Sequence, residues 1–69
     1  MNMLEHYLVP GYKLTLVKAK DANQYKLSDD TDWVIYDGKI DCYGHVEPLK
    51  RPFDIDEWKE VKDKGYFMA

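Results

Sequence analysis

The 69-residue sequence contains one cysteine, Cys42, and therefore cannot form a disulfide bond within a single chain. A chain this short buries only about 60% of the surface that its unfolded form exposes, so its stability must come from one small core or from a partner. We expect residues 1–69 to form one globular domain. Because proteins without disulfides are typical of reducing compartments, we also expect a cytoplasmic protein.

The sequence also lacks a long hydrophobic run. The segment MNMLEHYLVPGYK carries Glu5 and His6 inside its apolar stretch, which Pro10-Gly11 then breaks. A membrane-spanning helix needs about 20 predominantly apolar residues, and a signal peptide needs an apolar region of about 7 to 15. The sequence therefore predicts neither a membrane association nor a signal peptide.

Side chains suited to catalysis are few. No nucleophile elbow, phosphate-binding loop or zinc-protease motif occurs in the sequence. A chain of this length also has little room for a deep cleft. We therefore expect a protein that is not an enzyme, with no catalytic residues and no cofactor. The residues considered for catalysis are His6, Thr15, Ser28, Thr31, Cys42 and His45.

Metal-ligand patterns are incomplete. Cys42 and His45 have the C-x2-H spacing of one zinc-ligand pair, but a structural zinc site usually needs two such pairs. Asp41 and His6 are the further candidates. The acidic segment DDTDWVIYDG lacks the central glycine and the distant glutamate of an EF-hand calcium loop. We therefore expect no metal site and a buried free cysteine.

Basic residues are scarce in the middle of the chain. Residues 21–47 contain two lysines and seven acidic residues, whereas the formal net charge of the whole chain is −3. Binding to nucleic-acid phosphates normally requires a clustered basic face. The charge distribution disfavours direct nucleic-acid binding and favours a protein partner with a basic surface.

The first half of the sequence predicts strands. Residues 12–19, YKLTLVKA, alternate apolar and polar side chains, as a half-buried strand does, and residues 24–28 continue at the same spacing. Pro10-Gly11 suits the centre of a type II turn. Residues 3–8 fit either a short strand or one helical turn.

Asp37-Gly38 is among the strongest two-residue hairpin signals, because both residues tolerate the positive φ of a type I′ turn. It predicts a hairpin of strands 32–36 and 39–43. In that register, the apolar residues gather on an inner face and the charged residues on an outer face. The inner face consists of Trp33, Ile35, Ile40 and Cys42.

The C-terminal part of the sequence predicts an α-helix over residues 55–64. Asp54 is the expected N-cap and Gly65 the expected C′ residue. Together these elements predict an α+β domain, a small antiparallel meander of three or four strands with the helix packed on it. A small SH3-like barrel with a terminal helix is the alternative. The apolar stripe of the helix is Ile55, Trp58 and Val61.

The outer face of the predicted hairpin is the candidate partner-binding site. Tyrosines there would anchor a partner, and the acidic residues would steer a basic one. We expect a small protein-binding module that acts as an inhibitor, adaptor or accessory subunit, of the kind that phages and mobile elements encode. The predicted site consists of Asp32, Val34, Tyr36, Lys39, Asp41 and Tyr43.

Two alternatives use the same region differently. A DNA mimic would present acidic residues as a phosphate-like row, but the net charge is low and Lys39 interrupts the row. A single-stranded nucleic-acid binder would stack bases on Tyr36, Tyr43 or Trp33, but it lacks a basic groove. The acidic row of the DNA mimic consists of Asp29, Asp30, Asp32, Asp37, Asp41 and Glu47.

The chain is expected to be a monomer or a small homo-oligomer. An edge strand such as 12–19 could pair with its copy, although its lysines disfavour this.

Overall fold

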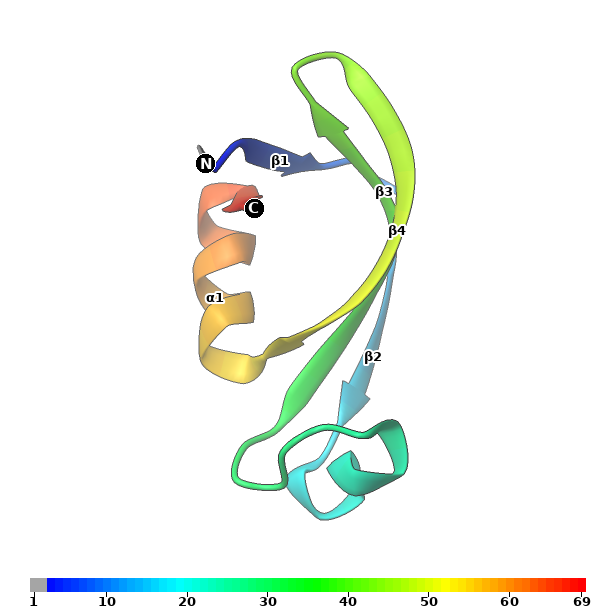
Figure 1. Ribbon diagram of the computed structural model, residues 1–69, viewed down its shortest axis with the longest axis vertical. Coiled ribbons are helices and arrows are strands. Elements are labelled where there is room, and N and C mark those ends of the chain that lie inside the picture. Colours follow the sequence, from blue (N-terminus) through cyan, green and yellow to red (C-terminus); the bar gives the residue numbers. More distant parts are fainter. Residues whose placement is uncertain (1–2) are drawn as a thin grey trace.

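The computed structural model describes residues 3–69, in which five strands form one antiparallel sheet and an α-helix lies on its concave side (Figure 1). The sheet curls into half of a barrel, and the predicted α+β class with a C-terminal helix is confirmed. Residues 1 and 2 of the predicted domain lie outside the described residues. The elements are β1 (Glu5–Leu8), β2 (Lys13–Val17), the 3-10 helix η1 (Ala19–Tyr25), β3 (Trp33–Cys42), β4 (His45–Asp54), α1 (Ile55–Lys64) and β5 (Tyr66–Met68).

Helix α1 has the bounds that the sequence predicts, and both caps are the expected residues. The Asp54 carboxylate accepts a hydrogen bond of 2.7 Å from the backbone N–H of Glu57. Such an N-cap stabilises a helix by about 1 kcal/mol. Gly65 has a φ of +84°, and its N–H donates to the carbonyl of Val61 at 2.7 Å. Trp58 and Val61 are buried, which confirms the predicted apolar stripe.

The predicted turn at Asp37-Gly38 is wrong, because both residues lie within β3. The two-residue turn is instead Tyr43-Gly44, with φ values of +52° and +88°, as a type I′ turn requires. Gly38 is needed for its lack of a side chain. A Cβ at this position would lie 2.5 Å from the Cβ of Tyr12, which crosses β3 here. A glycine within a strand can mark such a close approach of another segment.

The two strands predicted on either side of that turn, 32–36 and 39–43, are therefore one strand. Residues 45–54 form β4 and pair with β3 along its full length. The pairing runs from Cys42 opposite His45 to Trp33 opposite Asp54. Figure 1 shows this long, bent hairpin running along the half-barrel.

The unbroken strand also reverses half of the predicted face assignment. Successive side chains of a strand point to opposite faces. Val34 and Tyr36 therefore share the concave face with Ile40, and all three are buried in the core. Trp33 and Ile35, which were predicted to face inward, lie on the convex face. The prediction for Ile40 was correct because it did not depend on the strand before the supposed turn.

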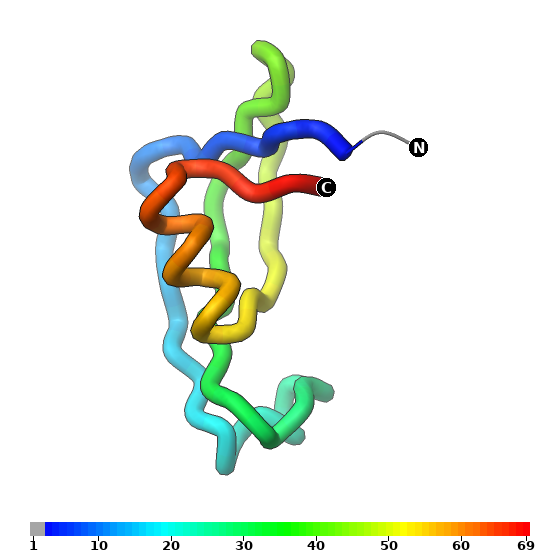
Figure 2. Tube along the Cα trace, turned by 90° about the vertical axis from the view of Figure 1, so that its left-hand side faces the viewer, coloured from blue at the N-terminus to red at the C-terminus, as the bar shows by residue number. Residues whose placement is uncertain are grey.

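Residues 3–8 contribute a strand, β1, and Pro10-Gly11 forms the predicted turn, with a φ of +101° at Gly11. β1 and β2 lie along the same edge of β3, at residues 40–41 and 33–37 respectively. The turn bends the chain between them, so that β1 also pairs with β5. Figure 2 shows β1 and β5 side by side, and next to them Leu4 and Ala69 exchange backbone hydrogen bonds of 2.8 and 3.0 Å.

The predicted strand 12–19 is confirmed as the shorter β2, whereas the predicted strand 24–28 is wrong. The chain instead forms η1 as far as Tyr25, and Ala22 within it is fully buried. Lys26 then ends η1 with a φ of +60°. Leu27 follows it, and its N–H donates to the carbonyl of Ala22 at 3.0 Å.

The core is rich in aromatic side chains. Tyr36 and Phe53 are fully buried in the sheet, and Trp58 of α1 packs on Phe53 with ring centroids 5.7 Å apart. Tyr12 lies between the two layers, 4.9 Å from the Tyr36 ring and 6.1 Å from the Trp58 ring. Aromatic pairs at such distances contribute about 0.5 to 1.5 kcal/mol beyond their buried area. The crossing of Tyr12 over β3 therefore joins helix to sheet.

Replacing Gly38 by alanine tests this crossing. The new Cβ would overlap the Tyr12 backbone, whose Cα lies 2.9 Å away, so the free energy of unfolding should fall by about 1 to 3 kcal/mol. Urea denaturation followed by tryptophan fluorescence measures the change. Asp37→Ala, at an exposed neighbouring position, is the control and should stay within about 0.5 kcal/mol of the wild type. Equal stability of the Gly38→Ala protein and the wild type would contradict the crossing.

Candidate functional site

The residues of the predicted partner-binding site do not form one surface. Val34 and Tyr36 are 5% and 0% exposed, so the prediction that they belong to an exposed face is wrong. Lys39 and Asp41 lie on the convex face of β3, and Tyr43 lies in the adjoining turn with 72% of its surface exposed. Only these last three remain together at one end of the hairpin.

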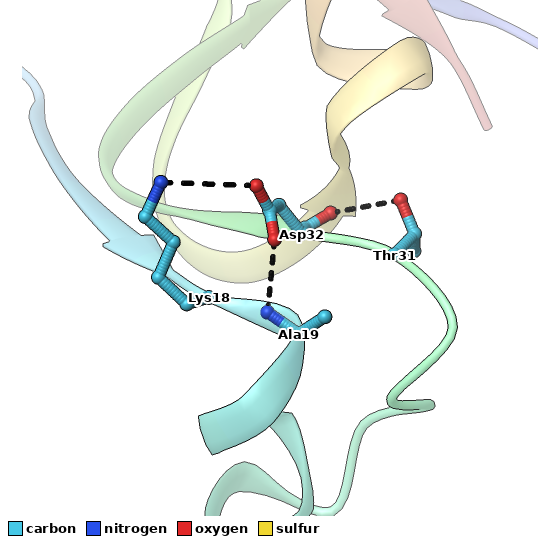
Figure 3. A network of polar contacts seen from close by, with 4 residues as sticks. All are labelled: Lys18, Ala19, Thr31 and Asp32. Atoms are coloured by element: carbon cyan, nitrogen blue, oxygen red, sulfur yellow. Dashed lines mark hydrogen bonds and ion pairs between the residues drawn. The ribbon is translucent and has the colours of Figure 1, made fainter.

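Asp32 lies at the opposite end of β3, where it has a structural role (Figure 3). One carboxylate oxygen accepts a hydrogen bond of 2.9 Å from the backbone N–H of Ala19. The other oxygen is 3.9 Å from the Nζ atom of Lys18. The hydroxyl of Thr31 donates to the backbone carbonyl of Asp32 at 3.3 Å. These contacts hold the first residue of η1 against the beginning of β3.

Tyr36 also has a structural role. Its phenol donates a hydrogen bond of 2.6 Å to the backbone carbonyl of Lys39, so its polar group is paired inside the core. Burial raises the pKa of the Tyr36 phenol, because the phenolate is disfavoured away from water. A partner cannot reach this ring while the helix covers the sheet.

A different set of side chains, exposed or half-buried, forms a row across four strands. On the convex face, the register aligns Val46 of β4 with Asp41 of β3, and Asp41 with Tyr7 of β1. Tyr7 is in turn aligned with Tyr66 of β5. Residues directly opposite one another on neighbouring strands share a face. We call this row and its neighbours the tyrosine face, which consists of Glu5, Tyr7, Asp41, Tyr43, Val46, Tyr66 and Met68.

The tyrosine face exposes several large apolar side chains. Val46 is 50% exposed, Met68 45% and Tyr7 44%, in addition to the exposed ring of Tyr43. The rings of Tyr7 and Tyr66 pack together with centroids 5.2 Å apart. Single exposed apolar residues are normal on a protein surface, but a contiguous group is typical of a binding site.

Two carboxylates lie among these rings. The phenol of Tyr7 donates a hydrogen bond to the Glu5 carboxylate, and this bond raises the pKa of Tyr7 to about 12. The Asp41 carboxylate accepts a hydrogen bond of 2.8 Å from the backbone N–H of Gly44, so it also shapes the hairpin turn. The tyrosine face is therefore both aromatic and acidic.

Sequence reasoning identified Asp41 and Tyr43 but missed the other members of the tyrosine face. Tyr7 and Tyr66 lie near opposite ends of the chain and meet only because β5 pairs with β1. Residues 5–8 do not alternate apolar with polar side chains, so their sequence indicated neither a strand nor a neighbour. The GYFM segment after the helix carried no signal of pairing with the N-terminus.

Other parts of the surface are weaker candidates for a functional site than the tyrosine face. Two shallow hollows are open to solvent, and Asp54, in the wall of one, already caps the helix. Cys42 is half-buried, has no disulfide partner and lies opposite His45. Within residues 3–69, no three His, Cys, Asp or Glu side chains converge as metal ligands. None of the helices in that range is both long and apolar enough to cross a membrane.

Comparison with protein families, curated proteins and solved structures finds no match to this chain.

The contact between Tyr7 and Glu5 can be tested by titration. Because the Glu5 carboxylate holds the phenol proton, Glu5→Gln should lower the pKa of Tyr7 from about 12 toward the ordinary value of 10.0. Tyr7 would then ionise earlier as the pH rises. NMR of ¹³Cζ-labelled tyrosine, assigned with Tyr7→Phe, measures this value. Glu47→Gln is the control and should leave it unchanged. An unaltered Tyr7 titration in Glu5→Gln would show that the contact is absent.

Proposed function

We propose that this chain is a small non-enzymatic protein-binding module that docks onto its partner through the tyrosine face. The observation that supports the proposal is the row of exposed and half-buried side chains on four paired strands, from Val46 to Tyr66. Tyrosine is favoured at interfaces because it offers a large apolar ring with a polar tip and has few rotatable bonds. A paired sheet also presents these rings in a fixed arrangement, which reduces the entropy lost on binding.

Charge supports a partner with a basic surface. Glu5 and Asp41 lie among the rings, where a lysine or arginine of a partner would be partly shielded from water and attracted more strongly. Docking there would inhibit the partner, recruit it or complete a larger assembly. Small binding modules of this kind are encoded by phages and mobile elements, and Cys42 without a disulfide fits a cytoplasmic setting.

Of the two alternatives, single-stranded nucleic-acid binding has one specific observation in its favour. Lys13, Lys39 and Lys50 lie on the same convex face as the tyrosines, with Lys13 and Lys50 on either side of Asp37. Bases could stack on Tyr7 while the lysines bind phosphates. We place this second because carboxylates border the rings. The same lysines interrupt the acidic row that a DNA mimic requires, which disfavours that alternative further.

Removing two anchors of the tyrosine face should abolish capture of the partner. Tyr7→Thr retains strand propensity, and Tyr43→Asn places the favoured Asn-Gly pair in the type I′ turn, so the double variant should remain folded. Anchor residues at interfaces are worth about 2 kcal/mol or more each, so recovery of the partner from a lysate should fall more than tenfold. Quantitative mass spectrometry of the captured proteins measures this loss.

Tyr25→Ala is the matched control for that experiment, because Tyr25 is 49% exposed but lies in η1, away from the tyrosine face. It should capture the same proteins as the wild type. Recovery of one partner equally by all three proteins would refute the proposal. Fluorescence anisotropy with a single-stranded oligonucleotide tests the alternative, since binding that weakens steeply with salt would indicate phosphate contacts.

A further inference from the structure

The outer edge of β4 is protected against pairing with another strand. In a two-residue hairpin the residues that flank the turn, here Cys42 and His45, exchange hydrogen bonds, and such pairs recur at every second residue. The backbone groups of residues 46, 48, 50 and 52 therefore point away from β3. Pro48 and Pro52 occupy two of these positions and have no N–H to donate. An incoming strand would find an incomplete row of donors.

The outer edge of β2 has no such protection. By the same alternation Lys13, Thr15 and Val17 bond to β3, which leaves the N–H and C=O groups of Leu14 and Leu16 pointing outward. Within residues 3–69 no strand other than β3 pairs with β2. The Leu14 and Leu16 side chains lie on the concave face beyond the reach of α1 and are 45% and 56% exposed. Figure 2 shows this edge uncovered along the side of the molecule.

We propose that β2 pairs antiparallel with β2 of a second copy of this chain, about a two-fold axis at Thr15. The segment Leu14-Thr15-Leu16 reads the same in both directions, so it is complementary to itself under that rotation. Leu14 of each copy lies opposite Leu16 of the other. Their outward backbone groups form four hydrogen bonds in this register, and the four leucines pack together on one face.

This register also removes the objection that lysines in the strand would repel each other. Lys13 lies opposite Val17 of the second copy, and Lys18 lies opposite Tyr12. No lysine faces a lysine. A two-fold axis through Leu14 or Leu16 satisfies the backbone alternation equally but leaves one leucine of each chain without a leucine opposite it. The register centred on Thr15 is therefore the one that the side chains favour.

The pairing does not rest on the proposed function. The tyrosine face lies on the convex side at the other end of β3, whereas the leucines lie on the concave side of β2. A dimer formed through β2 leaves both tyrosine faces free and presents two of them to a partner. Either inference can fail without the other.

A disulfide across the axis tests the register directly. Residues at a non-hydrogen-bonded antiparallel position have Cα atoms about 4.5 Å apart, within the range of a disulfide. Thr15→Cys in a Cys42→Ser background should therefore form a covalent dimer under mild oxidation, at least tenfold faster than Lys13→Cys in the same background. The two Lys13 Cα atoms would be about 14 Å apart, at about 3.4 Å per residue. Equal rates for the two variants would overturn the register.

Analytical ultracentrifugation of the wild-type chain, from micromolar to millimolar concentration, tests the pairing itself. A reversible monomer–dimer equilibrium is expected, and Leu16→Lys should raise its dissociation constant at least tenfold. Val46→Lys is the matched control, because Val46 is 50% exposed on β4, and it should leave the equilibrium unchanged. Circular dichroism checks that both variants are folded. A wild-type chain that stays monomeric throughout, or dimers equally sensitive to both substitutions, would overturn the proposal.

Discussion

The close crossing of Tyr12 over Gly38 is the contact on which the rest of the structure depends. Only a residue without a side chain lets another backbone approach a strand this closely, since a Cβ at Gly38 would lie 2.5 Å from that of Tyr12. The crossing holds the Tyr12 ring against Tyr36 in the sheet and near Trp58 in the helix. It follows directly after Pro10-Gly11, where the chain passes from β1 to β2 along one edge of β3. The crossing therefore contributes to the curvature of the sheet, to the packing of the helix and to the order of the strands.

The crossing also explains where the exposed surfaces lie. Because β3 continues through Gly38, it is long enough to pair with β2 at one end and with β1 at the other. Tyrosines from the N-terminal and C-terminal segments lie together near β1, at one end of β3. At the other end of β3, two leucines of β2 are exposed because the helix does not cover them. The prolines of β4 protect one edge of the sheet, while the opposite edge has none. A single unbroken strand thus separates the proposed partner-binding surface from the edge proposed to pair with a second copy.

Local signals in the sequence predicted local structure well. The caps at Asp54 and Gly65 predicted the helix with its observed bounds, and Pro10-Gly11 predicted its turn. In each case one short segment supplies all the interactions that decide the conformation. The position of the hairpin turn was predicted wrongly, because Asp37-Gly38 and Tyr43-Gly44 are both compatible with a turn. The choice between them depends on Tyr12, which lies 26 positions before Gly38 in the sequence. Once that choice was wrong, the alternation of faces placed Tyr36 outside instead of in the core.

By itself, the sequence determined the α+β class, the helix with its caps and the lack of an internal disulfide, because these follow from composition and short-range hydrogen bonding. It also indicated that tyrosines and carboxylates would meet on the surface. Only the tertiary structure decided which ones do. Tyr7 meets Tyr66 through the pairing of β1 with β5, and Tyr36 is buried because β3 does not turn at Gly38. Side-chain exposure depends on strand register, and register is set by contacts between residues far apart in the sequence.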